Sequence, residues 1–174
     1  METIVNSLAS FYKLSLNNGS DLYSLWKEIQ LITSYIKIQN IRWESSIELD
    51  TDIPDDLKQC QIPPFTLQPL VENSVLHGIR GNVKHKGRIS INAKKEENTV
   101  IITISDDGIG MKPELVNELN REMELISEDT VSGSHYGIQN SNQRLKIIFG
   151  PQYGMQVYSE ENEGTEVKIT IPAS

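Results

Sequence analysis

The chain has 174 residues, 37% hydrophobic and 23% charged, which fits one globular domain with an appendage or two small domains. The net charge of −8 argues against nucleic acid as a partner, because a phosphate backbone needs a broad basic face and the sequence shows none. The single cysteine, Cys60, excludes an intrachain disulfide and fits a reducing compartment. No apolar run approaches membrane-spanning length, so we expect no membrane contact by this chain.

The first 44 residues predict two helices joined by a short turn. Residues 3–16 carry apolar side chains at helical spacing, residues 17–19 form a turn, and a longer helix follows to about Trp43. So short a turn makes an antiparallel hairpin, which we predict as a separate unit over residues 1–44. Two interpretations are open: a structural subdomain that packs on the next unit, or a dimerisation element.

Residues 45–174 predict a second unit that mixes helices with a largely antiparallel sheet. The expected strands are 46–50, 88–95, 99–105, 153–159 and 166–171, and the expected helices are 63–78, 112–126 and 137–150. Because the helices are grouped and do not strictly alternate with the strands, the pattern is typical of an α+β two-layer sandwich.

The expected helix over residues 63–78 has an apolar face and a polar margin. The apolar positions at helical spacing are Leu67, Leu70, Val71 and Val75. Pro69, Asn73 and His77 are spaced by four and form one column along the edge of that face. An amide and an imidazole at this margin can both point into a cleft.

A second candidate site is DDGIGM, residues 106–111, which directly follows a predicted strand. The Asp106 carboxylate can accept hydrogen bonds from an amino group, and Gly108 and Gly110 let the backbone approach a flat ligand. The alternative interpretation is that this segment binds no ligand and that the two glycines only form a tight turn, which needs positive φ at both. Gly137 has two interpretations as well. It begins a helix whose free backbone N–H groups could bind phosphate, or it only marks the start of that helix.

The remaining candidates are weaker. Gly164 and Thr165 enter the last predicted strand, where a glycine is usually part of a turn. The three histidines have no metal-ligand spacing on one element, which argues against a zinc site.

The order of these patterns resembles the ATP-binding boxes of the GHKL superfamily. More closely, LQPLVENSVLHGI, YGIQNSNQRLKIIFGPQYG and EGTEVKITIP look like the C-terminal part of LytS/YesM-like sensor histidine kinases, and SLWKEIQLITSYIKIQNIRW resembles the segment before that family's catalytic domain. The resemblance covers nearly the whole chain. It implies a GHKL (Bergerat-type) fold for residues 45–174 and the tail of the dimerisation and phosphoacceptor region for residues 1–44.

The resemblance also implies a role for each motif residue. Asn73 would be the catalytic Mg²⁺ ligand, His77 a neighbour of the ATP phosphates, Asp106 the acceptor for the adenine amino group, Gly108 and Gly110 the room for adenine, Gly137 the start of the phosphate-facing helix, and Thr165 a support for Asp106. Residues 111–136 would form an ATP lid, and Arg144 or Lys146 are candidate cations for the phosphates.

Pro69 stands where ATP-hydrolysing relatives carry a glutamate base. Glu72 lies about 100° round the helix from Asn73 and is no obvious substitute. This pattern fits a domain that holds ATP for a nucleophile other than water.

The implied function is the ATP-binding catalytic domain of a two-component sensor histidine kinase, with ATP and Mg²⁺ as cofactors. It would transfer the γ-phosphoryl group to a histidine on an upstream helix of the same protein, for relay to a response regulator. We expect a homodimer in the full-length protein and a cytoplasmic domain of a membrane-anchored bacterial sensor. Because the acceptor histidine would lie upstream, this chain alone should not autophosphorylate.

An alternative function is a non-catalytic module that senses nucleotide or mediates dimerisation. Its motivation is that Asp107 stands where the family usually has asparagine, and His135 where it commonly has glycine.

Overall fold

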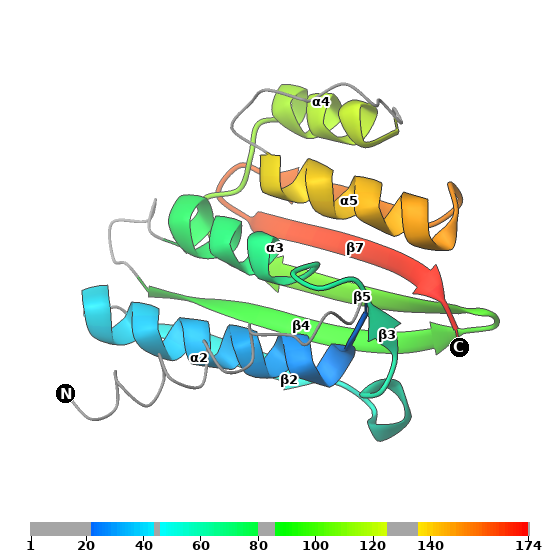
Figure 1. Cartoon of the computed structure of the whole chain (residues 1–174). Helices are drawn as coiled ribbons and strands as arrows, with labels where there is room; N and C mark the ends of the chain where they lie inside the picture. The colour runs from blue at the N-terminus through cyan, green and yellow to red at the C-terminus, as the bar shows by residue number, and fades with distance from the viewer. Residues whose placement is uncertain (1–21, 44–45, 80–85, 125–135, 174) are drawn as a thin grey trace.

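The computed structural model describes residues 22–43, 46–79, 86–124 and 136–173 (Figure 1). The helix expected over residues 3–16 lies outside the described residues. None of the helices in the described part of the chain is long and apolar enough to cross a membrane.

Seven strands and four helices make up the described chain. The strands are β1 (Tyr23–Ser24), β2 (Ser46–Asp52), β3 (Gln61–Ile62), β4 (Lys86–Glu96), β5 (Thr99–Asp106), β6 (Gly154–Glu160) and β7 (Gly164–Pro172). The helices are α2 (Leu25–Trp43), α3 (Gln68–Asn73), α4 (Pro113–Glu124) and α5 (Tyr136–Phe149), with the 3-10 turn η1 (Asp55–Leu57) and the π-helical turn η2 (Ser74–Ile79).

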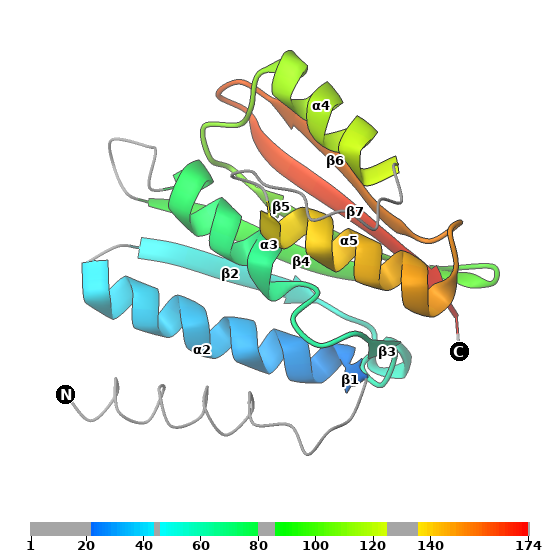
Figure 2. The same ribbon diagram turned by 45° about the horizontal axis from the view of Figure 1, so that its top comes forward.

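The main sheet has the strand order β2-β4-β5-β7-β6. The β2–β4 pair is parallel and the other three pairs are antiparallel, as expected for a largely antiparallel sheet. Helices α2, α3 and α5 lie side by side against one face of this sheet (Figures 1 and 2). The α+β two-layer sandwich predicted from the sequence is therefore confirmed.

The core forms where the alternating apolar residues of the strands meet the helices. In β5, Val100, Ile102 and Ile104 are buried, whereas the residues between them are on average more exposed. The buried face of α2 belongs to the same core. At the far end of α2, Asn40 exchanges two hydrogen bonds of 2.9 Å with the backbone of Ile47 in β2. The division at residue 44 stays a prediction, and α2 packs on β2 and α3.

The helix expected over 63–78 begins later, at Gln68. Phe65 has a φ of 57°, which is left-handed and incompatible with a right-handed helix. From Ser74 onward the backbone is π-helical. The predicted apolar face is confirmed, because all four of its residues are buried.

Helix α5 has a buried face and an exposed margin. The apolar spacing of residues 137–150 predicts Ile138, Leu145 and Ile148 for the core; Ile138 and Leu145 are buried, but Ile148 is 42% exposed. Three residues beyond Leu145, it lies about 60° round the helix and falls at the margin of the buried face.

Candidate functional site

A cavity of about 270 Å³ lies between α3, η2, the loop after β5, α4 and the start of α5. Its apolar lining residues are Leu70, Ile109, Met111, Leu115, Leu119, Ile138, Val157 and Val167, and the others are Asn73, Ser74, His77, Gly78, Asp106, Gly110 and Thr165. Five of the seven predicted site residues are therefore brought together: Asn73, His77, Asp106, Gly110 and Thr165.

Asp106 is the buried carboxylate of this cavity. It ends β5, is 9% exposed and accepts hydrogen bonds from the Ser74 hydroxyl at 2.6 Å and the Gly108 N–H at 2.9 Å. Burial raises the pKa of the Asp106 carboxyl, and these two hydrogen bonds oppose the rise. The backbone N–H of Thr165 is a third donor to this carboxylate, and because a carboxylate has about four acceptor sites, one more donor can still bind.

Ser74 was not predicted as a site residue. It directly follows Asn73 and holds the carboxylate of Asp106, 32 residues away in sequence. Ser74 and Gly78 are four residues apart, the same spacing as Asn73 and His77, and all four line the cavity. Ser74 and Gly78 thus form a second column beside Asn73 and His77, and this spacing is the sequence signal that could have identified Ser74.

Gly108 packs the loop after β5 against η2 and does not appear among the lining residues. A Cβ at Gly108 would lie 2.5 Å from the backbone of Gly78, and the N–H of Ile109 donates to the Gly78 carbonyl at 3.2 Å. Gly108 thus permits a close approach of two backbones.

Gly110 permits a second close approach. Its φ is +64°, and a Cβ there would lie 1.9 Å from the Glu160 carbonyl oxygen. Of the two glycines for which a turn with positive φ was the alternative, Gly110 has a positive φ and Gly108 does not, and Gly110 also borders the cavity.

Gly137 packs the first turn of α5 against α3. A Cβ at Gly137 would lie 3.1 Å from Cβ of Pro69. Gly137 is not among the described residues that line the cavity, although the next residue, Ile138, is.

The polar groups of the cavity differ in exposure. His77 is exposed, Asn73 is half-buried and Asp106 is buried. The Thr165 hydroxyl lies 2.9 Å from Oγ of Ser159, which also accepts the Met111 N–H at 2.9 Å. The cavity therefore has a buried acceptor at one place and an amide and an imidazole where solvent reaches it.

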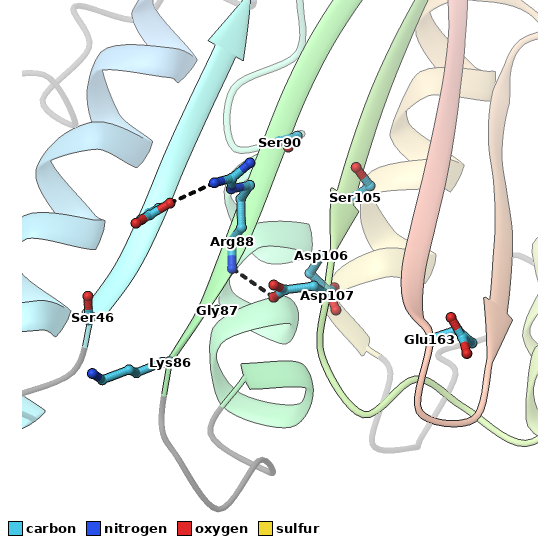
Figure 3. Close-up of a pocket in the computed structure, with 10 residues that line it drawn as sticks. Ser46, Lys86, Gly87, Arg88, Ser90, Ser105, Asp106, Asp107 and Glu163 are labelled. Atoms are coloured by element: carbon cyan, nitrogen blue, oxygen red, sulfur yellow. Dashed lines mark hydrogen bonds and ion pairs between the residues drawn. The ribbon is translucent and has the colours of Figure 1, made fainter.

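Asp107 points out of the cavity, unlike its neighbour. Its Oδ1 accepts the backbone N–H of Arg88 at 2.7 Å, which extends the pairing of β5 with β4 (Figure 3). The Arg88 guanidinium in turn pairs with Glu48 at 3.0 Å. The carboxylate at this position thus bonds to a strand edge and does not line the cavity. His135 lies outside the described residues.

The two candidate cations of α5 are engaged elsewhere. Arg144 donates to the Pro64 carbonyl at 2.6 Å, and Lys146 donates to the Met123 carbonyl at 2.5 Å. Neither is among the described residues that line the cavity.

Glu72 also points elsewhere, because it accepts a hydrogen bond from the Gln68 amide at 2.9 Å. Among the described lining residues, Asp106 is the one carboxylate, and it already accepts two hydrogen bonds. The described cavity therefore offers no uncommitted carboxylate to activate water.

The comparisons with known proteins show the class to which this domain belongs. The family model for the histidine kinase-, DNA gyrase B-, and HSP90-like ATPase matches residues 64–174, and the chain belongs to this family. A second model, for the histidine kinase family, matches residues 1–47.

The chain is 31% identical over 169 residues to the sensor histidine kinase YesM of Bacillus subtilis, covering 97% of this chain and 27% of YesM. It is 30% identical over 166 residues to the sensor protein LytS of Staphylococcus saprophyticus, covering 95% of this chain and 27% of LytS. The resemblance found in the sequence is confirmed, and the chain spans 27% of the length of these relatives.

Solved structures show the same fold. The catalytic domain of histidine kinase ThkA matches with a TM-score of 0.58 at 14% identity, covering 87% of this chain and 94% of that domain. The histidine kinase domain of a blue-light activated kinase from Erythrobacter litoralis matches with a TM-score of 0.57 at 15% identity, covering 98% of this chain and 73% of that one.

Proposed function

We propose that this chain is the ATP-binding catalytic domain of a sensor histidine kinase and donates the γ-phosphoryl group of ATP to a histidine elsewhere in its protein. The observation that carries the proposal is a buried carboxylate, Asp106, at the wall of a largely apolar cavity in a chain of this ATPase family.

The cavity suits the adenine base. Its apolar walls favour a flat ring with little hydration, and Asp106 provides a hydrogen-bond acceptor for an exocyclic amino group. A hydrogen bond to a charged group contributes about 1.5–3 kcal/mol, which is enough to select adenine over a base that presents a carbonyl there.

Asn73 and His77 suit the phosphate side, because they lie at the more exposed part of the same cavity. A side-chain amide oxygen is a hard ligand, and Mg²⁺ in nucleotide sites takes its other ligands from phosphate and water. Within the described residues no group of three or more His, Cys, Asp or Glu side chains could hold a metal, so Asn73 would act together with the nucleotide. Bound Mg²⁺ would neutralise the charge of the phosphates.

The partners follow from the proposed reaction. They are an upstream phosphoacceptor helix of the same protein, a response regulator and a second copy of the full-length chain. The relatives are named as sensors, which supports a cytoplasmic domain of a membrane-anchored bacterial protein.

A thermal-shift titration with a non-hydrolysable ATP analogue and Mg²⁺ tests the proposal. Ligand at 100 times its Kd should stabilise the native chain by about 2.7 kcal/mol. Asn73→Ala should remove the Mg²⁺-dependent part of this shift, whereas Asn92→Ala, at a β4 position that alternates with the buried ones, should not.

Phosphoryl transfer is tested with a longer chain that carries the upstream histidine. It should autophosphorylate with Mg·ATP, and Asn73→Ala should abolish the reaction. No stabilisation by saturating Mg·ATP analogue would contradict the proposal and favour a non-catalytic dimerisation module.

A further inference from the structure

The start of α3 is capped by a side chain from another helix. The residue at its own N-cap position, Leu67, makes no side-chain cap, and the first N–H groups of a helix have no partner within it. Glu28 of α2 fills this role, because its carboxylate accepts the N–H of Phe65 at 2.7 Å and the N–H of Leu67 at 3.0 Å. Removing this carboxylate would leave buried donors without partners.

Glu28 is fully buried, with 0% of its surface exposed. Burial raises the pKa of the Glu28 carboxyl, and backbone N–H groups from Phe65 to Gln68 oppose the rise. A negative charge at this place also interacts favourably with the positive end of the α3 dipole. A buried carboxylate is costly unless hydrogen bonds satisfy it, and here the backbone N–H groups of the turn before α3 do so.

The turn that Glu28 binds is held from the opposite side as well. Phe65 has a φ of 57°, a conformation that costs a non-glycine residue about 1–2 kcal/mol. From α5, Ser141 donates to the Phe65 carbonyl at 3.3 Å and Arg144 donates to the Pro64 carbonyl at 2.6 Å. The turn is therefore fixed between α2 and α5.

This turn sets where α3 begins, and Asn73 is six residues beyond Leu67 on the same short helix. A shift at the start of a packed helix moves its whole length, because the helix is a rigid unit about 1.5 Å long per residue. Glu28 lies in the part of the chain that matches the histidine kinase model, whereas Phe65 and Leu67 lie in the part that matches the ATPase model.

We propose that Glu28 is a positioning residue for the nucleotide site: by fixing the turn before α3 it places Asn73 and couples α2 to the cavity. This inference rests on the proposed nucleotide site.

The test compares two mirrored substitutions on α2. Glu28→Gln keeps the shape but replaces one acceptor by a donor, so one of the two hydrogen bonds to the turn is lost. Asn40→Asp is the matched control, because it replaces a donor by an acceptor and breaks one of the two hydrogen bonds to Ile47 in β2.

Isothermal titration with a Mg·ATP analogue should give a Kd about 5-fold or more higher for Glu28→Gln, within the range typical of coupled sites. Asn40→Asp should leave the Kd unchanged, although both variants lower the melting temperature without ligand. Combined with Asn73→Ala, Glu28→Gln should cost less affinity than it does alone, because its effect passes through Asn73.

A reciprocal measurement uses the unmodified chain and does not depend on the folding of a variant. Linkage requires that bound nucleotide strengthen the Glu28 hydrogen bonds. The analogue should therefore slow hydrogen exchange at the amides of Phe65 and Leu67 more than at the amide of Ile47.

The outcomes separate the two proposals. Equal Kd values for Glu28→Gln and Asn40→Asp, or equal changes in exchange at the turn and at Ile47, would overturn the positioning role and leave the nucleotide site standing. Failure of the unmodified chain to bind the analogue would overturn the proposed function and this inference with it.

Discussion

Two adjacent aspartates at the end of β5 have different environments. Side chains alternate between the faces of a strand, so Asp106 points toward the helices and Asp107 points away from them. Asp106 is buried against Ser74, and Asp107 is exposed and bonds to the backbone of Arg88. The same substitution should therefore affect the proposed site at Asp106 and leave it unaffected at Asp107.

Asp106→Asn should weaken binding of a Mg·ATP analogue about 10- to 100-fold, because a hydrogen bond to a charged acceptor contributes about 1.5–3 kcal/mol. Asp107→Asn should bind with unchanged affinity, since an amide oxygen can still accept the Arg88 N–H. Isothermal titration of the two variants measures this difference. Equal affinities for the two would show that adenine does not contact Asp106.

Asp106→Asn should also change the dependence of stability on pH. Burial raises the pKa of Asp106, so the native state binds this proton more tightly than the unfolded chain does, and the free energy of unfolding falls as pH rises through the native pKa. An asparagine does not titrate, so the variant should gain stability relative to the unmodified chain as pH rises. Denaturant unfolding from acid to neutral pH checks this, and a constant difference would contradict it.

Among the elements, α4 is joined to strand β6 by the side chain of Asn120. Asn120 donates to the Val157 carbonyl at 2.8 Å and accepts the Val157 N–H at 2.9 Å, so it pairs with β6 as another strand would. Leu115 and Leu119 of the same helix line the cavity. This pair therefore contributes to the position of α4, which lies in the stretch predicted as the lid, together with the hydrogen bonds that α5 makes to Glu122 and Met123.

Asn120→Ala should loosen α4 without unfolding the rest of the chain. Two lost hydrogen bonds at about 1 kcal/mol each would lower the free energy of local opening by about 2 kcal/mol. Hydrogen exchange at the amides of α4 should become about 30-fold faster, while exchange in β5 stays the same. Asn117→Ala, at an exposed position of α4, is the matched control. Unchanged exchange in α4 would mean that its apolar contacts and its hydrogen bonds to α5 hold it without Asn120.

How far the elements were predictable depends on the range of the interactions that form them. Alternation and helical spacing are local, and they predicted the five strands of the main sheet and the buried face that contains Leu67 and Val75. The start of α3 was misplaced because Glu28, 37 residues before Phe65, stabilises a non-helical turn there. Ser74 was missed for the same reason, since its partner Asp106 is 32 residues away.

At the scale of the whole molecule, α2 and the sheet share one core. An amphipathic pattern predicts which face of a helix is buried, but it does not identify the element that covers this face. The sequence therefore left two possibilities open for α2: packing on the next unit, or dimerisation. In the structure, Leu25, Ile29, Ile32 and Ile36 belong to the same hydrophobic cluster as the strands of the sheet. This packing leads to a prediction about where a folded fragment can begin.

A chain that begins at residue 45 should not fold stably. It would lose four fully buried α2 side chains, each contributing about 1.5–3 kcal/mol, and the sum is comparable with the whole stability of about 5–15 kcal/mol of a typical domain. We expect no cooperative thermal transition by circular dichroism. In the full chain, Ile32→Ala should cost about 2–5 kcal/mol, whereas Ile41→Ala, at a 40% exposed position of the same helix, should cost far less. A fragment from residue 45 that melts cooperatively at the temperature of the full chain would show that the ATPase core is complete without α2, and that the boundary near residue 44 divides two independent units.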